Sequence, residues 1–181
     1  MRIVAGKYRH RNIIYPDDAT HTRPTKDRVR EAIFSAVGDI NGARVLDLYA
    51  GSGAMGIEAL SRGAKFCAFV DVSNLAIKVI KDNINNLKIN DNEYQIIKDK
   101  DINALEQFKS QGQKFDLVFL DPPYEQGQYQ QIVELLISKD LLNEHAIIVI
   151  EANRDVNLEN IDYNKKKEYH YGEIKVFIYW R

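Results

Sequence analysis

Between residues 44 and 151 the sequence alternates short apolar runs with amphipathic segments, and this alternation limits the possible folds more than any other feature. The runs are nearly continuous in apolar residues, as in FDLVFLD at Phe115–Asp121 and AIIVIE at Ala146–Glu151. Continuous apolar strands are typical of a parallel sheet that helices cover on both faces. The predicted strands are Arg44–Ala50, Phe66–Val72, Tyr94–Lys98, Phe115–Asp121 and Ala146–Glu151.

Helices are predicted before and between these strands. From Thr25, a good N-cap, to Gly38 the apolar residues recur at the spacing of one helix face. Further helices are predicted at Ala54–Arg62, Asn74–Leu87, Ile102–Ser110 and Gln128–Ile137. Near the end of the chain, Lys166–Tyr171 and Ile174–Trp180 flank a glycine and predict an antiparallel hairpin. A mostly parallel sheet with a C-terminal hairpin and helices on both faces predicts the Rossmann-like α/β fold of class I methyltransferases.

The composition limits the chemistry. The single cysteine, Cys67, permits no disulfide within the chain and suits a reducing cytosol, so we expect a cytoplasmic protein. The sequence contains no CxxC or HExxH string, which predicts that the protein has no metal site. The first residues, MRIVAGKYRHRN, are charged and lack a long apolar stretch, which predicts neither a signal peptide nor a membrane span.

Positive charge is concentrated near the N-terminus. Residues 1–30 carry eight Lys or Arg against three Asp, a net of +5, so the remainder carries −6 within an overall charge of −1. A basic segment on an acidic body is typical of proteins that bind nucleic acid, although a merely solvated N-terminus shows the same pattern. We divide the chain into a basic arm or hairpin at 1–24 and one domain at 25–181. On this division, removing residues 1–15 is expected to leave the domain folded.

A glycine-rich loop, Gly51-Ser52-Gly53-Ala54-Met55-Gly56, lies between the first predicted strand and its helix. Such GxGxxG loops turn tightly and let a ligand approach the backbone. Asp71 follows Gly51 by 20 residues at a strand end, where a carboxylate can accept both hydroxyls of a ribose. A dinucleotide fits these features too. Asp47, however, would repel a pyrophosphate and suits the ammonium group of S-adenosylmethionine, so we favour that cofactor.

The tetrapeptide Asp121-Pro122-Pro123-Tyr124 ends the fourth predicted strand, which neighbours the first strand in this topology. A nucleobase amino group is a poor nucleophile because its lone pair is delocalised into the ring. Asp121 and the Pro122 carbonyl can each accept one of its N–H groups, the prolines stiffen the backbone, and Tyr124 offers a flat surface for the base. This arrangement predicts a direct displacement that is catalysed by positioning and electrostatics. A rigid turn would explain the prolines alone, but not their coincidence with the glycine loop and Asp71.

Taken together, four segments resemble the RsmD family of 16S ribosomal RNA guanine-N2 methyltransferases. They are RIVAGKYRHR at Arg2–Arg11, TRPTKDRVREAIF at Thr22–Phe34, LDLYAGSGAMGIEALSRGA at Leu46–Ala64 and FLDPPY at Phe119–Tyr124. The resemblance implies that S-adenosylmethionine is the cofactor and that ribosomal RNA, or an assembly intermediate of the small subunit, is the substrate. It also implies that Asp121–Tyr124 are catalytic.

The same resemblance and the strand-end positions together give a predicted cofactor site. Its members are Asp47, Tyr49, Ala50, Gly51, Ser52, Gly53, Asp71, Val72, Asp101 and Ile102. The family often has an Asp-Ala pair that contacts the adenine after the third strand. This chain has Asp99-Lys100-Asp101-Ile102 there, and we prefer Asp101 with Ile102, with Asp99 as the alternative.

The basic residues of the first segment are predicted to contact RNA. They are Arg2, Lys7, Arg9, Arg11, Arg23, Arg28 and Arg30. For the last three, a solvated helix face is the alternative. Three other functions also fit parts of the sequence: methylation of adenine N6 or cytosine N4 in RNA or DNA, nicotinamide-dependent oxidoreduction, and RNA binding without catalysis.

Overall fold

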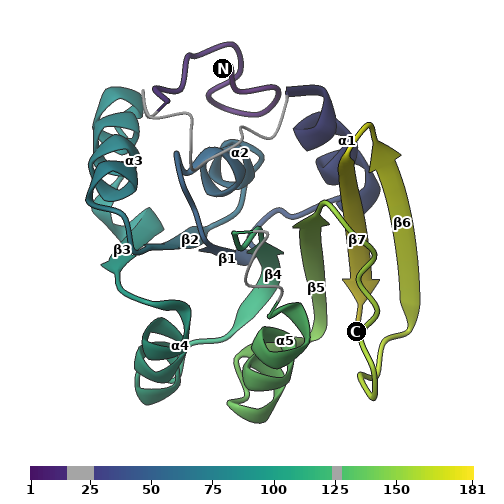
Figure 1. Ribbon diagram of the computed structural model, residues 1–181. Coiled ribbons are helices and arrows are strands. Elements are labelled where there is room, and N and C mark those ends of the chain that lie inside the picture. The colour runs from purple at the N-terminus through teal and green to yellow at the C-terminus, as the bar shows by residue number, and fades with distance from the viewer. Residues whose placement is uncertain (16–26, 124–127) are drawn as a thin grey trace.

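A seven-stranded sheet in the order β3-β2-β1-β4-β5-β7-β6 forms the middle layer of the protein (Figure 1). The computed structural model describes residues 1–15, 27–123 and 128–181, so the predictions for Arg23 and Tyr124 lie outside the described residues. Strands β1 to β5 are parallel, and β7 is antiparallel to both of its neighbours. The strands are β1 (Arg44–Leu48), β2 (Phe66–Asp71), β3 (Tyr94–Lys98), β4 (Phe115–Leu120), β5 (Leu142–Ala152), β6 (Lys165–Tyr171) and β7 (Ile174–Trp180).

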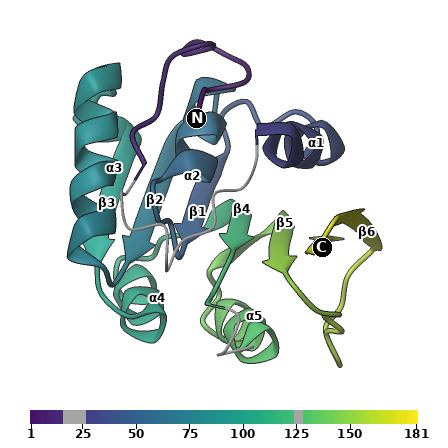
Figure 2. The ribbon, with the colours of Figure 1, turned by 45° about the horizontal axis from the view of Figure 1, so that its top comes forward.

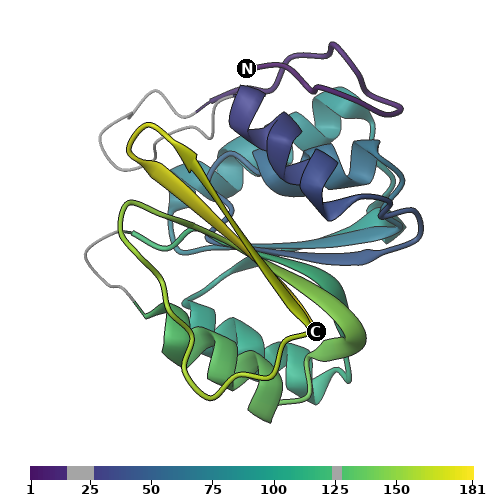
Figure 3. The same cartoon turned by 90° about the vertical axis from the view of Figure 1, so that its right-hand side faces the viewer.

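Helices cover both faces of this sheet (Figure 3). Helices α1, α2 and α3 lie on one face, and α4 and α5 lie on the other. The helices are α1 (Asp27–Val37), α2 (Ala54–Ser61), α3 (Asn74–Leu87), α4 (Asp101–Ser110) and α5 (Tyr129–Ser138), with a short 3-10 helix at Asp91–Glu93. In the described part of the chain, none of them is both long and apolar enough to cross a membrane.

Strand β1 shows why the apolar runs are continuous. Val45 belongs to the core cluster on the α1–α3 side of the sheet, whereas Leu46 and Leu48 belong to the cluster on the α4–α5 side. Because side chains alternate between the faces of a strand, a strand that is covered on both faces needs apolar residues at nearly every position. The predicted Rossmann-like α/β architecture, a mostly parallel sheet with helices on both faces and a C-terminal hairpin, is confirmed.

The largest error in the predicted bounds is at β5, which begins at Leu142 instead of Ala146. After the buried Leu142, the residues Asn143, Glu144 and His145 are polar and lie outside the core, so they interrupt the apolar pattern. The pairing with β4 also shifts register in this region, between Phe115 and Leu117. An irregular and solvated strand start leaves little signal in the sequence.

The N-terminal arm, residues 1–15, lies across the ends of α1, α2 and α3 (Figure 2). It is a loop closed by a single antiparallel bridge between Arg2 and Asn12. Ile3 and Ile13 are 1% and 3% exposed and belong to the core cluster that α1, α2 and α3 also build. The arm therefore forms part of the core of the domain, which argues against the expectation that residues 1–15 can be removed without loss of the fold.

The order of the strands reverses between β1 and β4, because the chain first builds outward to β3 and then returns to the other side of β1. In open α/β sheets such a reversal opens a crevice at the carboxyl ends of the strands, where ligands bind. Both the glycine loop and Asp121-Pro122-Pro123, the described part of the tetrapeptide, follow the strands at this point. The fold thus places the two predicted motifs at one edge of the sheet.

Candidate active site

The glycine loop turns sharply from β1 into α2. Gly51 and Gly53 have φ angles of 54° and 76°, in the left-handed region that favours glycine. A Cβ atom at Gly56 would lie 2.3 Å from the ring of Phe69 on β2, so the third glycine lets α2 pack closely against the sheet. Each glycine of the motif therefore has a structural reason that agrees with the sequence prediction.

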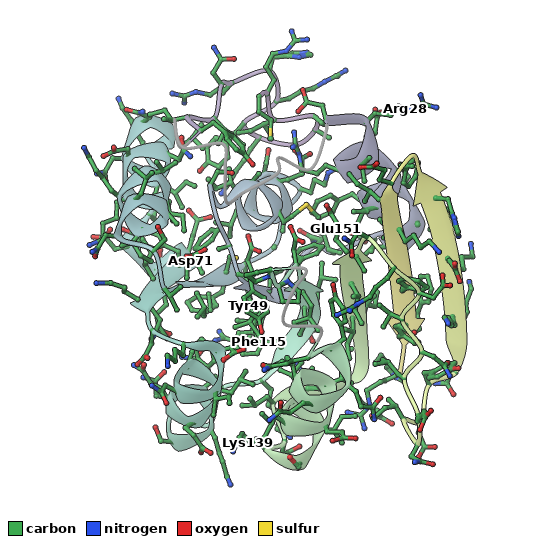
Figure 4. The ribbon with its side chains drawn as sticks, viewed as in Figure 1. Arg28, Tyr49, Asp71, Phe115, Lys139 and Glu151 are labelled. Atoms are coloured by element: carbon green, nitrogen blue, oxygen red, sulfur yellow. The ribbon has the colours of Figure 1, made fainter. Side chains whose placement is uncertain are left out.

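Asp71 joins the end of β2 to this loop. Its Oδ2 accepts the amide N–H of Gly51 at 2.8 Å, and its Oδ1 accepts the amide N–H of Ser73 at the same distance. Figure 4 shows Asp71, Tyr49 and Glu151 following one another across the sheet, from β2 through β1 to β5. The carboxylate thus lies beside the backbone of the loop, as its predicted role requires.

The main chain between β1 and the loop is held by β2. The amide N–H groups of Tyr49 and Ala50 both donate to the carbonyl of Val70, at 3.0 and 2.9 Å. Ser52 is buried, and its carbonyl accepts a hydrogen bond from the amide side chain of Asn83 on α3. These contacts fix the backbone against which a ligand would lie.

Asp47 lies beneath the loop and is only 4% exposed. Its Oδ2 accepts the amide N–H of Gly56 at 2.9 Å. Burial, helped by the nearby charge of Asp71 and opposed by the hydrogen bond from Gly56, raises the pKa of this carboxyl to about 7. A carboxyl with this pKa gains its charge most readily when a cation lies close to it.

The carboxylate of Asp101 is brought to the end of β1 by a hydrogen bond from the hydroxyl of Tyr49 to its Oδ2, at 2.5 Å. The other oxygen accepts the amide N–H of Ile102. Asp99, in contrast, bonds the nearby Lys100 and Asn103. Of the two predicted alternatives, the structure connects Asp101 to the glycine loop and leaves Asp99 within its own turn.

Two apolar side chains near these carboxylates are exposed to solvent. Val72, directly after Asp71, is 60% exposed, and Ile102, directly after Asp101, is 40% exposed. At both places an acidic residue is followed by an exposed apolar one. This pairing suits a ligand that has both a polar part and a flat apolar part. Both residues were predicted to bind the cofactor.

Asp121 immediately follows β4, and Pro122 after it is buried whereas Pro123 is exposed. Burial raises the pKa of the Asp121 carboxyl well above its usual range, and the charges of Glu151 and Asp47 add to this effect. Perturbed carboxyl groups of this kind are common at functional sites. Asp121 is therefore a candidate catalytic residue on physical grounds as well as by its motif.

Two residues near Asp121 were not predicted. Tyr15, at the end of the described arm, forms a side-chain hydrogen bond with Ser52, and burial raises its pKa to about 12, with Asp121 and Glu151 adding to the rise. Glu151 near the end of β5 is 5% exposed. Glu151 gave the same sequence signal as Asp71 and Asp121, an acidic residue ending an apolar strand. Tyr15 gave none, because only the folded arm carries it to the loop.

Four of the predicted RNA-contacting residues lie on the arm and are exposed: Arg2, Lys7, Arg9 and Arg11. Two of them have partners within the protein. Lys7 forms an ion pair with Glu93 at 2.5 Å, and Arg11 donates to the carbonyl of Asn86 at 2.6 Å. On α1, Arg28 is exposed. These five side chains can be reached by a large ligand.

Arg30 requires a correction. Its side chain is completely buried, where its Nε donates to Glu58 on α2 and its Nη2 donates to the carbonyl of Arg2 and to Asp27. A guanidinium with these partners and no exposed surface cannot contact a phosphate group. Arg30 therefore holds α1, α2 and the arm together, and its assignment to RNA contact is wrong.

The described ranges 1–15, 27–123 and 128–181 contain no group of three or more His, Cys, Asp or Glu side chains that is placed to hold a metal ion.

The sheet order, the helices on both faces and the C-terminal hairpin define a methyltransferase of the Rossmann-like class. A family model described as "Conserved hypothetical protein 95" matches residues 1–180. The chain belongs to this family, the RsmD family. It is 35% identical over 156 residues to "Ribosomal RNA small subunit methyltransferase D" of Haemophilus influenzae, with 86% of this chain and 80% of that protein covered.

Two further proteins extend the comparison. The protein of the same name from Escherichia coli is 32% identical over 165 residues, which cover 91% of this chain and 80% of the relative. A solved structure from Escherichia coli, described as a candidate methyltransferase named yhhF, superposes with a TM-score of 0.84 at 29% identity and covers 100% of this chain and 97% of that one.

Proposed function

We propose that this protein transfers the methyl group of S-adenosylmethionine to the exocyclic N2 amino group of a guanine in 16S ribosomal RNA of the small subunit. The observation that carries the proposal is the position of Asp121-Pro122 across the strand reversal from the glycine loop and Asp71. The names of the relatives support small-subunit ribosomal RNA as the substrate. The choice of guanine as the target base rests on the resemblance of the sequence motifs to those of the RsmD family.

The described residues fit the cofactor. Each oxygen of the Asp71 carboxylate accepts one backbone N–H and has a second lone pair, which can accept a ribose hydroxyl. Val72 and Ile102 are exposed apolar side chains that can cover the faces of an adenine, and Asp101, next to Ile102, can accept a hydrogen bond from its amino group. The raised pKa of Asp47 suits a nearby ammonium. When bound, the cofactor supplies an electrophilic methyl group on a sulfonium.

The chemical step needs the target amine to be held and made more nucleophilic. The Asp121 carboxylate accepts one N–H and the Pro122 carbonyl accepts the other, so the nitrogen becomes more pyramidal and its lone pair points at the methyl group. The nitrogen carries an extra proton after transfer, and Asp121 can accept it because its pKa is raised. No covalent bond to the protein is needed, and burial raises the pKa of the Cys67 thiol far above that of a reactive thiolate.

The exposed cations of the arm and of α1 are proposed to hold the RNA. Arg2, Lys7, Arg9, Arg11 and Arg28 give the molecule a concentrated positive region, whereas the chain beyond residue 30 carries a net charge of −6. An acidic body repels phosphates on average, so positive side chains are needed to offset this repulsion.

The experiment that tests the proposal compares ribosomal RNA from a strain that lacks the gene with RNA from the same strain carrying it on a plasmid. Mass mapping of the small-subunit RNA should find one N2-methylated guanine that disappears with the gene and returns with the plasmid. Methylation of adenine N6 or cytosine N4 instead would overturn the choice of base. Calorimetry should show binding of S-adenosylhomocysteine and no binding of NADH, and the reverse result would overturn the activity.

A further inference from the structure

Glu151 is placed beside Asp121 by the pairing of β4 with β5. The two strands are parallel, with Phe119 opposite Val149 and Leu120 opposite Ile150, so the next residues along the chain are Asp121, directly after β4, and Glu151 on β5. Side chains alternate along a strand, so Glu151 projects toward the same face as Val149, and Asp121 lies directly after the end of the neighbouring strand. That face carries α2 and the arm, including Tyr15 with its hydrogen bond to Ser52.

The chemistry proposed above does not account for this second carboxylate. One amine has two N–H groups, and Asp121 and the Pro122 carbonyl accept both of them. Glu151 is 5% exposed, so its carboxyl group lies in the buried region beside the end of β4. The negative charge of Glu151 contributes to the raised pKa of the Asp121 carboxyl. The strand register and this electrostatic effect both place the two acidic groups near each other.

The three amino-bearing bases differ at the atom beside the amino group. Guanine has a donor there, N1–H, so its edge presents adjacent donors to the protein. Adenine has the N1 lone pair at the corresponding place, and cytosine has the N3 lone pair. A carboxylate at this position would therefore bind guanine and repel the other two bases.

We propose that Glu151 accepts the N1–H of the target guanine while Asp121 holds its N2 amino group, so that the two strand ends together select guanine against adenine and cytosine. This proposal rests on the proposed function, whose base specificity it explains. It assigns Glu151 to recognition of the base, with Asp121 assigned to the reaction.

The test uses small-subunit particles reconstituted with RNA that carries either guanine or 2-aminopurine at the mapped position. 2-Aminopurine keeps the amino group but has a lone pair at N1. The wild-type protein should methylate it roughly 10- to 150-fold more slowly than guanine, the loss expected when a hydrogen bond to a charged group is removed. Equal rates would overturn the proposal, and this comparison requires no variant to fold.

The Glu151→Gln variant then separates the contact from the intrinsic reactivity of the two bases. A glutamine amide can accept from N1–H or donate to an N1 lone pair, so the guanine preference should fall toward one. Dividing the rate ratios of the two proteins cancels the reactivity of the bases, as in a double-mutant cycle. The Glu144→Gln variant is the matched control, since Glu144 is an exposed carboxylate on the same strand.

A purely structural role for Glu151 predicts a different result. Glu151→Gln would then slow both bases equally and leave their ratio at the wild-type value, which would overturn the proposal. Affinity for S-adenosylhomocysteine, measured by calorimetry, should be unchanged in the variant. Failure of the proposed function is recognised separately, because the mapping experiment would then find the methyl group on another base or find none.

Discussion

Arg30 and Glu58 form an ion pair, with Nε and Oε2 3.2 Å apart, in which both side chains are completely buried. Glu58 also accepts the amide N–H groups of Val4 and Ala5 and an N–H of Arg62. A single carboxylate on α2 thus joins α1 and the N-terminal arm. The arm passes from this anchor to Tyr15, whose hydroxyl bonds with Ser52 in the glycine loop. Anchoring the arm therefore also builds one side of the candidate active site.

Replacing Arg30 should destabilise the fold strongly. Arg30→Ala leaves the carboxylate of Glu58 buried with fewer donors, and removing one partner of a buried pair costs about 3–5 kcal/mol. Arg28→Ala is the matched control, because Arg28 is exposed on the same helix and its loss should change stability by less than ~0.5 kcal/mol. Urea unfolding of both variants measures the difference, and equal stabilities would show that the pair does not anchor the arm.

The positive side chains of the arm can be tested without removing the arm itself. Replacing Lys7, Arg9 and Arg11 together by alanine should weaken RNA binding and make it less dependent on salt. The slope of log K against log salt should become shallower by about 0.7–0.9 for each phosphate that the variant no longer neutralises. Filter binding of small-subunit particles at several salt concentrations provides the measurement. Lys167→Ala, on the distant strand β6, should leave both affinity and slope unchanged.

The fold was predictable because its signal is local. Each strand of the parallel sheet is buried on both faces and has an apolar run, and helix α3 was predicted to the residue at Asn74–Leu87. The position of the N-terminal arm was not predictable in the same way. In the sequence, Arg30 is indistinguishable from the other positive residues of its helix. Only its contact with Glu58, 28 positions along the chain, shows that its side chain is buried.

The candidate site was likewise only partly predictable. Asp71 and Asp121 could be named because acidic residues that end apolar strands carry a signal in one sequence, whereas Asp101 was named from the resemblance to the RsmD family. The choice between Asp99 and Asp101 depends on where each side chain points, and the hydrogen bond from the Tyr49 hydroxyl shows this for Asp101. Tyr15 required the path of the arm, which depends on contacts with three helices.

The raised pKa of Asp47 predicts that the stability of the ligand-free protein depends on pH. Its pKa is about 7 in the fold against 3.8 for the free side chain, so the folded state binds more protons between these values. Stability contributed by this group is present at low pH and is lost as pH rises from about 4 through 7, by an amount on the order of 4 kcal/mol. Asp47→Asn keeps an acceptor for Gly56 and cannot ionise.

The variant should therefore gain stability over the wild-type protein as pH rises. Urea unfolding at pH near 4.5 and near 8 measures this gap, which we expect to be small at the lower pH and to reach a few kcal/mol at the higher pH. A gap of the same size at both pH values would show that Asp47 does not titrate in this window.

Replacing Asp101 and replacing Asp99 should affect cofactor binding differently. Asp101→Ala removes the carboxylate that Tyr49 holds beside the glycine loop, so S-adenosylhomocysteine should bind roughly 10- to 150-fold more weakly. Asp99→Ala is the control, since Asp99 bonds only nearby residues of its own turn in the hydrogen bonds described. Calorimetry with both variants decides the assignment, and a larger loss for Asp99→Ala would reverse it.

Asp121 should be needed for methyl transfer and dispensable for the cofactor. Asp121→Ala removes the acceptor that holds the target amine, so transfer should be abolished while affinity for S-adenosylhomocysteine stays close to the wild-type value. Asp121→Asn should retain more activity, because its amide oxygen still accepts one N–H. A fully active Asp121→Ala protein would refute the mechanism.

The pH profile of the same variants gives a second readout. Protonated Asp121 presents a poorer acceptor to the amine, and its pKa is raised by burial and by the charges of Glu151 and Asp47. The wild-type rate should therefore fall on acidification at a higher pH than an ordinary carboxyl would cause. Asp121→Asn cannot ionise at this position, so this acid limb should disappear from its single-turnover rate. An unchanged acid limb in the variant would assign the titration to another group.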